Sequence, residues 1–201
     1  MPEDRIENLS EASLKILEKA MPLFARSGFD GVSMRDIAGA VGVKAPALYN
    51  HFKDKQCLYL AVVSYAFANK SQGLIRVLSS AEPAEVRLRS FIFSLCDLMV
   101  KGGDFRSLLQ RELLDGDDER LKILGTQVFA KLFELLTFVL NEINPKTKNV
   151  NMLAVTVIGM VRQHFELQPL YQFLPGVSDG PIDPEELSEN VLSVIMYGIK
   201  G

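Results

Sequence analysis

Apolar residues recur at helical spacing along most of the chain. Leu14, Leu17, Met21 and Phe24 fall on one face of a first helix, expected to end at Gly28 because a left-handed glycine often follows a helix. Comparable stripes recur towards the C-terminus and are separated by short polar turns. No segment is rich in the strict alternation of apolar and polar residues that marks a β-strand. The pattern predicts an all-α protein of about nine helices.

Several helix starts are marked by capping residues. Asn8 and Glu11, and likewise Ser33 and Asp36, have the three-residue spacing of a capping box. Asp54 precedes the next apolar stripe and has the short, oxygen-bearing side chain that N-caps favour. These signals predict that helices begin near each of the three caps.

A more specific pattern lies in residues 33–55, which read SMRDIAGAVGVKAPALYNHFKDK. Ala38 is small enough for a crossing helix to approach, Gly42 suits a tight turn, and Leu48 can fill the angle between two helices. Three such constraints within a short stretch predict a helix-turn-helix. Its second helix, the one expected to enter the DNA groove, is predicted at residues 45–51.

Residues 8–60 resemble the TetR family of bacterial transcriptional regulators. The pattern Gly-Val-x-x-x-x-Leu-Tyr-x-His-Phe-x-x-Lys runs unbroken through residues 42–55. The other matching residues are Phe24, Gly28, Phe29, Ser33, Ile37, Ala38 and Leu58. The resemblance implies a dimer that binds a palindromic operator and leaves it when a small molecule enters a larger helical domain. Beyond the first quarter of the chain only the all-helical layout is similar to the family.

The resemblance also implies two domains. Residues 1–54 are expected to form a three-helix DNA-binding domain, and residues 55–201 a larger helical domain for effector binding and dimerisation. The connection at Lys53 and Asp54 is too short to be a flexible linker. Effector binding is therefore expected to tilt the helix that begins there and to move the two DNA-reading domains of the dimer apart.

DNA contacts are predicted at both ends of the groove-entering helix. A duplex is held by donors to phosphate and read by groups that meet base edges in the major groove. Ala47 can contact a thymine methyl, Asn50 can pair with adenine, and Tyr49 and His51 match residues that donate to phosphate in the family. The predicted DNA-binding residues are Ser33, Lys44, Ala45, Ala47, Tyr49, Asn50, His51 and Lys55. The plainer alternatives are a solvated Asn50 and a Tyr49 in the core.

Net charge by itself does not point to nucleic acid. The chain carries a formal net charge of −3, and residues 1–55 contain eight basic and eight acidic side chains. Arg35, Lys44, Lys53 and Lys55 nevertheless bracket the groove-entering helix. Local attraction to phosphate, rather than a broad basic face, predicts DNA affinity that falls only modestly as the salt concentration rises.

The last two predicted helices, near residues 150–168 and 184–198, are the candidates for a homodimer interface. One unit reads only a half-site, and two helices from each subunit can form a four-helix contact. The predicted interface residues are Val155, Gly159, Arg162, Val191 and Ile195. The alternative is that the first of these helices, apolar on nearly all sides, is simply the central core helix.

An unidentified, largely apolar small molecule is the expected effector. The candidate pocket residues are Phe91, Leu95, Met99, Phe105, Leu109, Phe129, Phe133, Met160 and His164. Each apolar side chain in this set is also a normal core residue. Arg111 and Glu112 are expected to be a surface pair.

Other chemistry finds no support in the sequence. There is no phosphate-binding loop, no local nucleophile signature and no Cys/His cluster, so neither an enzyme, a metal nor a cofactor is predicted. His164 and Glu166 lack metal-ligand spacing. Cys57 and Cys96 lie in apolar stripes and are expected to be reduced core thiols of a cytoplasmic protein. The apolar run at residues 152–161 is too short to cross a membrane, so no membrane partner is predicted.

These patterns favour a ligand-responsive, homodimeric transcriptional repressor that binds double-stranded DNA. An alternative keeps the DNA binding and drops the small molecule, so that the larger domain only dimerises or binds a protein partner. An enclosed pocket would argue against that alternative.

Overall fold

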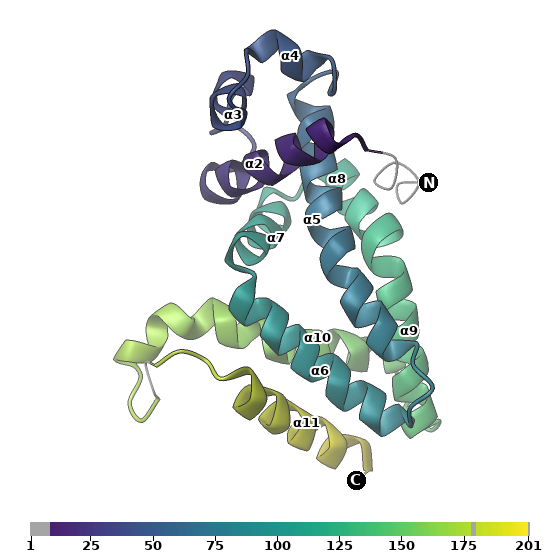
Figure 1. Cartoon of the computed structure of the whole chain (residues 1–201). Coiled ribbons are helices and arrows are strands. Elements are labelled where there is room, and N and C mark those ends of the chain that lie inside the picture. Colours follow the sequence, from purple (N-terminus) through teal and green to yellow (C-terminus); the bar gives the residue numbers. More distant parts are fainter. Residues whose placement is uncertain (1–8, 178–179, 201) are drawn as a thin grey trace. The chain divides into compact units, whose positions relative to one another are not determined.

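The computed structural model describes residues 9–177 and 180–200 of the chain. No β-strand occurs within these ranges, which confirms the all-α prediction (Figure 1). The chain packs as two compact units, unit 1 with Met1–Ser71 and Gly102–Ala130, and unit 2 with Gln72–Lys101 and Lys131–Gly201. The predicted boundary between residues 54 and 55 separates a DNA-binding from an effector domain by function, not by packing, and it stays a prediction.

Unit 1 is built around the first helices and the N-terminal part of a long one. Its helices are α2 (Glu11–Ser27), α3 (Met34–Val41), α4 (Ala45–Tyr49), α5 (Lys55–Leu78) as far as Ser71, α7 (Gly103–Asp115), α8 (Asp118–Ile123) and the π-helix η1 (Leu124–Phe129). Helix α2 packs against both α3 and α7, and α3 packs against α4. The core is aromatic: the rings of Phe24 and Tyr59 lie 4.7 Å apart, and those of Phe67 and Phe105 4.8 Å apart.

Local signals set the ends of the first helices. Ser33 and Asp36 form the predicted capping box at the start of α3, with each side chain bonded to the other residue's backbone N–H. Gly28 and Gly42 take positive φ angles of 70° and 82° after α2 and α3, where a side chain would be strained. Helix α2 is capped by Ser10, whose hydroxyl accepts from the backbone N–H of Ser13 at 3.2 Å. The start expected at Asn8 lies outside the described residues.

Unit 2 contains the remaining helices. These are α6 (Ala84–Lys101), α9 (Ala130–Ile143), α10 (Val150–Leu167), the short 3-10 helix η2 (Gln168–Phe173) and α11 (Pro184–Lys200). Helix α11 lies alongside α6, and both contact α10 (Figure 1). The side chains of Phe91, Ile92 and Cys96 are completely buried on α6. This packing covers the buried apolar residues of α10, which are Ala154, Val157, Val161 and Phe165.

Helices α8, η1 and α9 run on without a break as one helix, Asp118–Ile143. Within the described residues there are nine helices when this continuous helix is counted once and the short 3-10 helix η2 is left out. By length and composition alone it is the one helix of the described residues that could cross a membrane, with mean hydropathy 1.6 over an 18-residue window. One such helix is weak evidence, because core helices of soluble proteins pass the same test.

The two cysteines differ in environment. Cys96 is buried, as expected, and burial raises the pKa of its thiol to about 12. Cys57 is exposed on α5, so its prediction as a core thiol is wrong. The apolar face of α5 begins at the next residue, Leu58, which is fully buried.

Candidate nucleic-acid interface

The groove-entering helix α4 is short and held mainly by one side chain. It contains five residues and ends at Tyr49, two residues earlier than expected. Its N-cap residue, Lys44, makes no side-chain cap, and Pro46 occupies the first turn. Leu48 is fully buried, which confirms that it fills the angle between α3 and α4. An isolated helix of this length is not stable in water, so burial of Leu48 holds α4 in place.

Most of the predicted DNA-binding residues face solvent. Tyr49 is 53% exposed, which rules out the core-aromatic alternative, and Ser33, Lys44, Asn50 and His51 are also exposed. Ala45 and Ala47 are half-buried on α4. The structure thus gathers these seven on and beside α4 and at the start of α3, while their contact with DNA remains a prediction.

The imidazole of His51 is oriented by α2. Its Nδ1 lies 3.0 Å from the hydroxyl of Ser13, which in turn lies 2.9 Å from the hydroxyl of Ser10. Nε2 is the other ring nitrogen, and it can donate to a phosphate in the tautomer in which the Ser13 hydroxyl donates to Nδ1. The start of α2 therefore takes part in presenting the C-terminal end of α4.

Lys55 lies differently from what its sequence position suggested. Its ammonium donates to the carbonyl oxygen of Phe29 at 2.9 Å and sits 4.2 Å from the centre of the Phe29 ring. The side chain is half-buried and supports the loop after α2. A phosphate contact by Lys55 stays a prediction, and it would require this side chain to leave Phe29.

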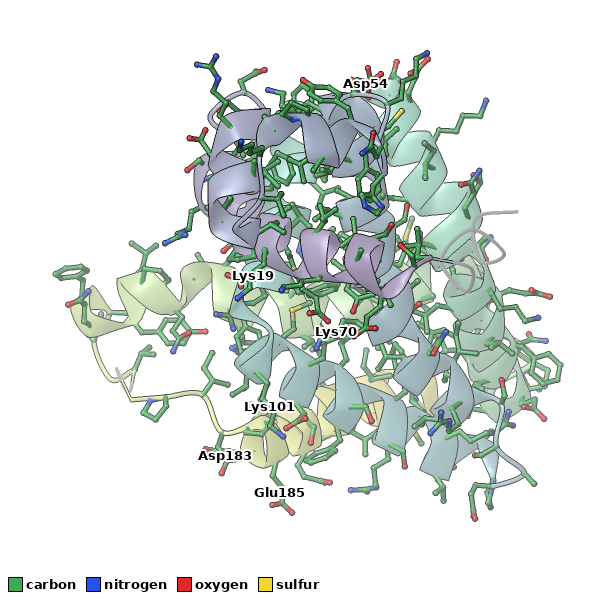
Figure 2. All side chains as sticks on the ribbon, turned by 45° about the horizontal axis from the view of Figure 1, so that its top comes forward. Lys19, Asp54, Lys70, Lys101, Asp183 and Glu185 are labelled. Atoms are coloured by element: carbon green, nitrogen blue, oxygen red, sulfur yellow. The ribbon has the colours of Figure 1, made fainter. Side chains whose placement is uncertain are left out.

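Two carboxylates cap the helices of this region. Asp54, labelled in Figure 2, accepts from the backbone N–H of Cys57 at 2.7 Å at the start of α5. This bond lowers the pKa of Asp54, and the hydrogen bonds from Ser33 lower the pKa of Asp36 in the same way. Both caps therefore stabilise the folded state above the ordinary carboxyl pKa and weaken as the pH falls below it.

A buried polar network joins α5, α7 and α8. Glu112 is completely buried, so its prediction as a surface residue is wrong. The Tyr59 hydroxyl donates to one of its carboxylate oxygens, and Arg120 Nε donates to the other at 2.9 Å. Burial by itself would lower the pKa of Arg120, but the hydrogen bond and charge of Glu112, together with the charges of Asp117 and Tyr59, outweigh it and the pKa is raised. Sequence reasoning missed this cluster because Tyr59 and Glu112 are 53 residues apart.

Alkaline pH is expected to destabilise the protein through Tyr59. Burial, with the bond to Glu112, raises the pKa of the Tyr59 hydroxyl far above 10.0. The folded state therefore keeps the proton that the unfolded chain loses, so stability is complete below pH ~10 and falls above it by about 1.4 kcal/mol per pH unit. The free energy of unfolding, measured with urea across this pH range, should fall less steeply in Tyr59→Phe than in wild type. Tyr49→Phe, the same substitution at an exposed tyrosine, is the matched control, and an equal slope in wild type and Tyr59→Phe would contradict the assignment.

The predicted effector residues are distributed over both units. Phe105, Leu109 and Phe129 belong to unit 1, whereas the others belong to unit 2. Phe91, Leu95, Met99 and Phe105 are buried, and the remaining residues, Leu109, Phe129, Phe133, Met160 and His164, are half-buried. The Nδ1 atom of His164 lies 2.9 Å from the Tyr171 hydroxyl. Their joint role in a pocket remains a prediction.

Unit 1 carries a groove of its own, with a volume of about 430 Å³. None of the predicted effector residues line it. Its walls are formed by Leu9, His51, Phe52, Lys53, Cys57, Leu60, Ala61, Ser64, Ile123 and Gln127. No group of three potential metal ligands occurs among the residues that the structure describes.

The predicted dimer residues divide into outward and inward sets. Val155 is 59% exposed, and a side chain added at Gly159 would meet nothing. Arg162 pairs with Glu166 on α10. Val191 and Ile195 are buried within unit 2. The outward apolar residues of α11 are instead Val194 and Tyr197, so an interface on this helix would use them.

Known proteins with similar sequences were found mainly through the N-terminal region. The family described as bacterial regulatory proteins, tetR family, matches residues 16–62. The uncharacterized HTH-type transcriptional regulator YerO of Bacillus subtilis (strain 168) is 28% identical over 117 residues, which are 57% of this chain and 40% of YerO. IcaR of Staphylococcus aureus (strain Newman), a negative transcriptional regulator of the biofilm operon icaADBC, is 40% identical over 53 residues, which are 26% of this chain and 28% of IcaR.

Solved structures extend the similarity of fold to nearly the whole chain. AibR, solved in complex with isovaleryl coenzyme A and operator DNA, has a TM-score of 0.71 and 23% identity. The match covers 92% of this chain and 97% of that one. The curated relatives, by contrast, are matched over less than half of their own length. The helix-turn-helix built by α3 and α4 lies within the stretch, residues 16–62, that matches the family of bacterial regulatory proteins, tetR family, and the solved structures show a similar fold over nearly the whole chain.

Proposed function

We propose that the protein is a DNA-binding transcriptional regulator, and specifically a repressor. The observation that carries the proposal is the exposure of Lys44, Tyr49 and Asn50 on a short helix anchored by the buried Leu48. Such an arrangement offers the charge of Lys44 and the hydroxyl of Tyr49 to phosphates and the amide of Asn50 to a groove. IcaR, which the N-terminal region is similar to, is a negative regulator. A regulator of this kind works in the bacterial cytoplasm.

The regulator is proposed to act as a homodimer on a palindromic operator. One α4 helix covers a single half-site, and a second copy supplies the other about 34 Å along the duplex. The exposed apolar residues of α10 and α11 support a subunit contact there. They are Met152, Val155, Leu167, Val194 and Tyr197.

A small-molecule effector is proposed to release the protein from its operator. Support comes from AibR, which has a similar fold and was solved with both an acyl coenzyme A and operator DNA. For release, the effector must bind the state that cannot hold DNA more tightly than the state that can. The chemical class of this effector is left to ligand screening against the protein–operator complex.

Selection of duplexes from a random pool tests the DNA binding. The wild-type protein is expected to enrich palindromic sites, and Lys44→Ala and Tyr49→Ala are each expected to weaken binding to the selected site about tenfold, because each removes a phosphate contact. Fluorescence anisotropy over a salt series gives the affinities and the salt slope. Lys148→Ala, which removes an exposed charge in unit 2, is the control and should bind as wild type. Enrichment of no duplex, or unchanged affinity in both variants, would refute the proposal.

A further inference from the structure

Three cationic side chains converge on the short segment from Ala25 to Phe29, which contains the end of α2 and the start of its connection to the helix-turn-helix. Lys55 of α5 donates to the carbonyl oxygen of Phe29 at 2.9 Å. Arg120 of α8 lies 5.8 Å from the centre of the Phe29 ring. Arg111 of α7 donates to the carbonyl oxygens of Ala25 and Arg26. Contacts from three helices that are distant in sequence, α5, α7 and α8, therefore fix the conformation of this segment.

The contacts of Arg111 complete the end of α2. The last carbonyl groups of a helix have no partner within it, and they carry the negative end of the helix dipole. Arg111 Nε donates to Ala25 O at 2.8 Å, and its Nη2 donates to Arg26 O, so a guanidinium 85 residues away acts as the C-terminal cap. Gly28 adopts its positive φ beside this side chain, and an added Cβ would lie 3.4 Å from Arg111 Nη1.

Glu112, the next residue of α7, supplies a negative charge beside this segment. Glu112 is completely buried and pairs with Arg120, which also reaches Asp115 at 3.2 Å and Asp117 at 3.4 Å. The Tyr59 hydroxyl, donating to Glu112, brings α5 into the same network. The Tyr59 ring packs edge-on against Phe29, with 5.1 Å between ring centres. Consecutive residues of α7 thus fix the end of α2 on one side and the pairing of α5 with α8 on the other.

We propose that Arg111 and Glu112 are positioning residues that make α7 part of the DNA-reading body, by fixing the orientation of the helix-turn-helix through the Ala25–Phe29 segment. The helix-turn-helix then turns with α7 rather than independently of it. A displacement of α7 changes the distance between the two α4 helices of a dimer. This inference rests on the proposed DNA binding and names the residues that set the geometry of that binding.

The test compares Arg111→Met, Arg111→Lys and the control Leu114→Ala, an exposed position on the same helix. Methionine keeps the apolar stem of Arg111 and removes both hydrogen bonds, whereas lysine keeps the charge and can restore one of them. Each purified variant is first shown to be folded by circular dichroism. Affinity is then measured by anisotropy on the duplex selected by wild type and on duplexes with one or two base pairs added between the half-sites. Hydrogen exchange of the peptides covering residues 22–32 is measured without DNA.

In Arg111→Met the backbone amides of Ala25–Phe29 are expected to exchange about tenfold faster than in wild type. The ratio between its affinities for the selected and the lengthened duplexes is expected to be about tenfold smaller than that of wild type. Arg111→Lys should recover part of both effects, and Leu114→Ala should show neither. A folded Arg111→Met protein with the wild-type spacing profile would overturn the inference, because a residue that only adds stability does not alter spacing preference. A wild-type protein that selects no duplex would instead refute the proposed function, and that result is independent of the variants.

Discussion

Replacing Glu112 by alanine is expected to lower the free energy of unfolding by about 3–5 kcal/mol. The carboxylate is completely buried, and its partner Arg120 has only 11% of its side chain exposed. Removing Glu112 leaves the guanidinium without its main counter-charge and the buried Tyr59 hydroxyl without its acceptor. Such a loss costs more than the pair itself contributes, because desolvated groups remain unpaired. Urea unfolding followed by circular dichroism measures the change.

Two controls separate the buried charge from helix and packing effects. Leu114→Ala changes an exposed side chain of α7 and should alter stability by no more than about 0.5 kcal/mol. Glu112→Gln keeps the size and the acceptor for Tyr59 but loses the charge, so its cost should lie between those of the other two variants. A Glu112→Ala protein as stable as Leu114→Ala would show that the network contributes nothing to the fold.

Leu48→Ala is expected to cost about 2–5 kcal/mol and to abolish duplex binding under conditions where wild type binds. Leu48 is fully buried at the junction of α3 and α4, so truncation leaves a cavity beneath the short helix. Helix α4 has five residues and no side-chain cap from Lys44, and it therefore lacks the local stability to survive that loss. Thermal unfolding and anisotropy with the selected duplex measure the two effects.

Val43→Ala is the matched control for Leu48→Ala. Val43 is an aliphatic residue of the same motif, but it is 41% exposed and its backbone N–H still donates to Ala38 O. Its truncation should leave both stability and duplex binding close to those of wild type. If Leu48→Ala bound DNA as tightly as Val43→Ala, the anchoring role of Leu48 would be wrong.

Local sequence signals predicted the helix-turn-helix correctly. The capping box of Ser33 and Asp36, the turn at Gly42 and the burial of Leu48 were all expected, and the structure confirms each. These features depend on neighbours within about one or two helical turns, so the residues that create them lie in one short segment. The all-α class followed for the same reason, since helical periodicity is a local property.

The errors concern residues whose environment is set by distant parts of the chain. Glu112 was expected at the surface, yet the carboxylate lies among groups from α5 and α8. Cys57 was expected in the core but is exposed. The spacing of apolar residues shows which face of a helix is apolar. It does not show which residues at the border of that face are buried by the rest of the protein.

By itself the sequence determined the helices, their caps and the helix-turn-helix, and through them the similarity of the N-terminal region to the TetR family. Only the tertiary structure decided that Arg111 caps α2, that Lys55 rests on Phe29 and that Val191 faces inward. Caps and turns are stabilised by bonds between near neighbours, so their chemistry can be read from adjacent letters. A buried ion pair or a covered face is stabilised only when folding brings remote groups together and removes water from both.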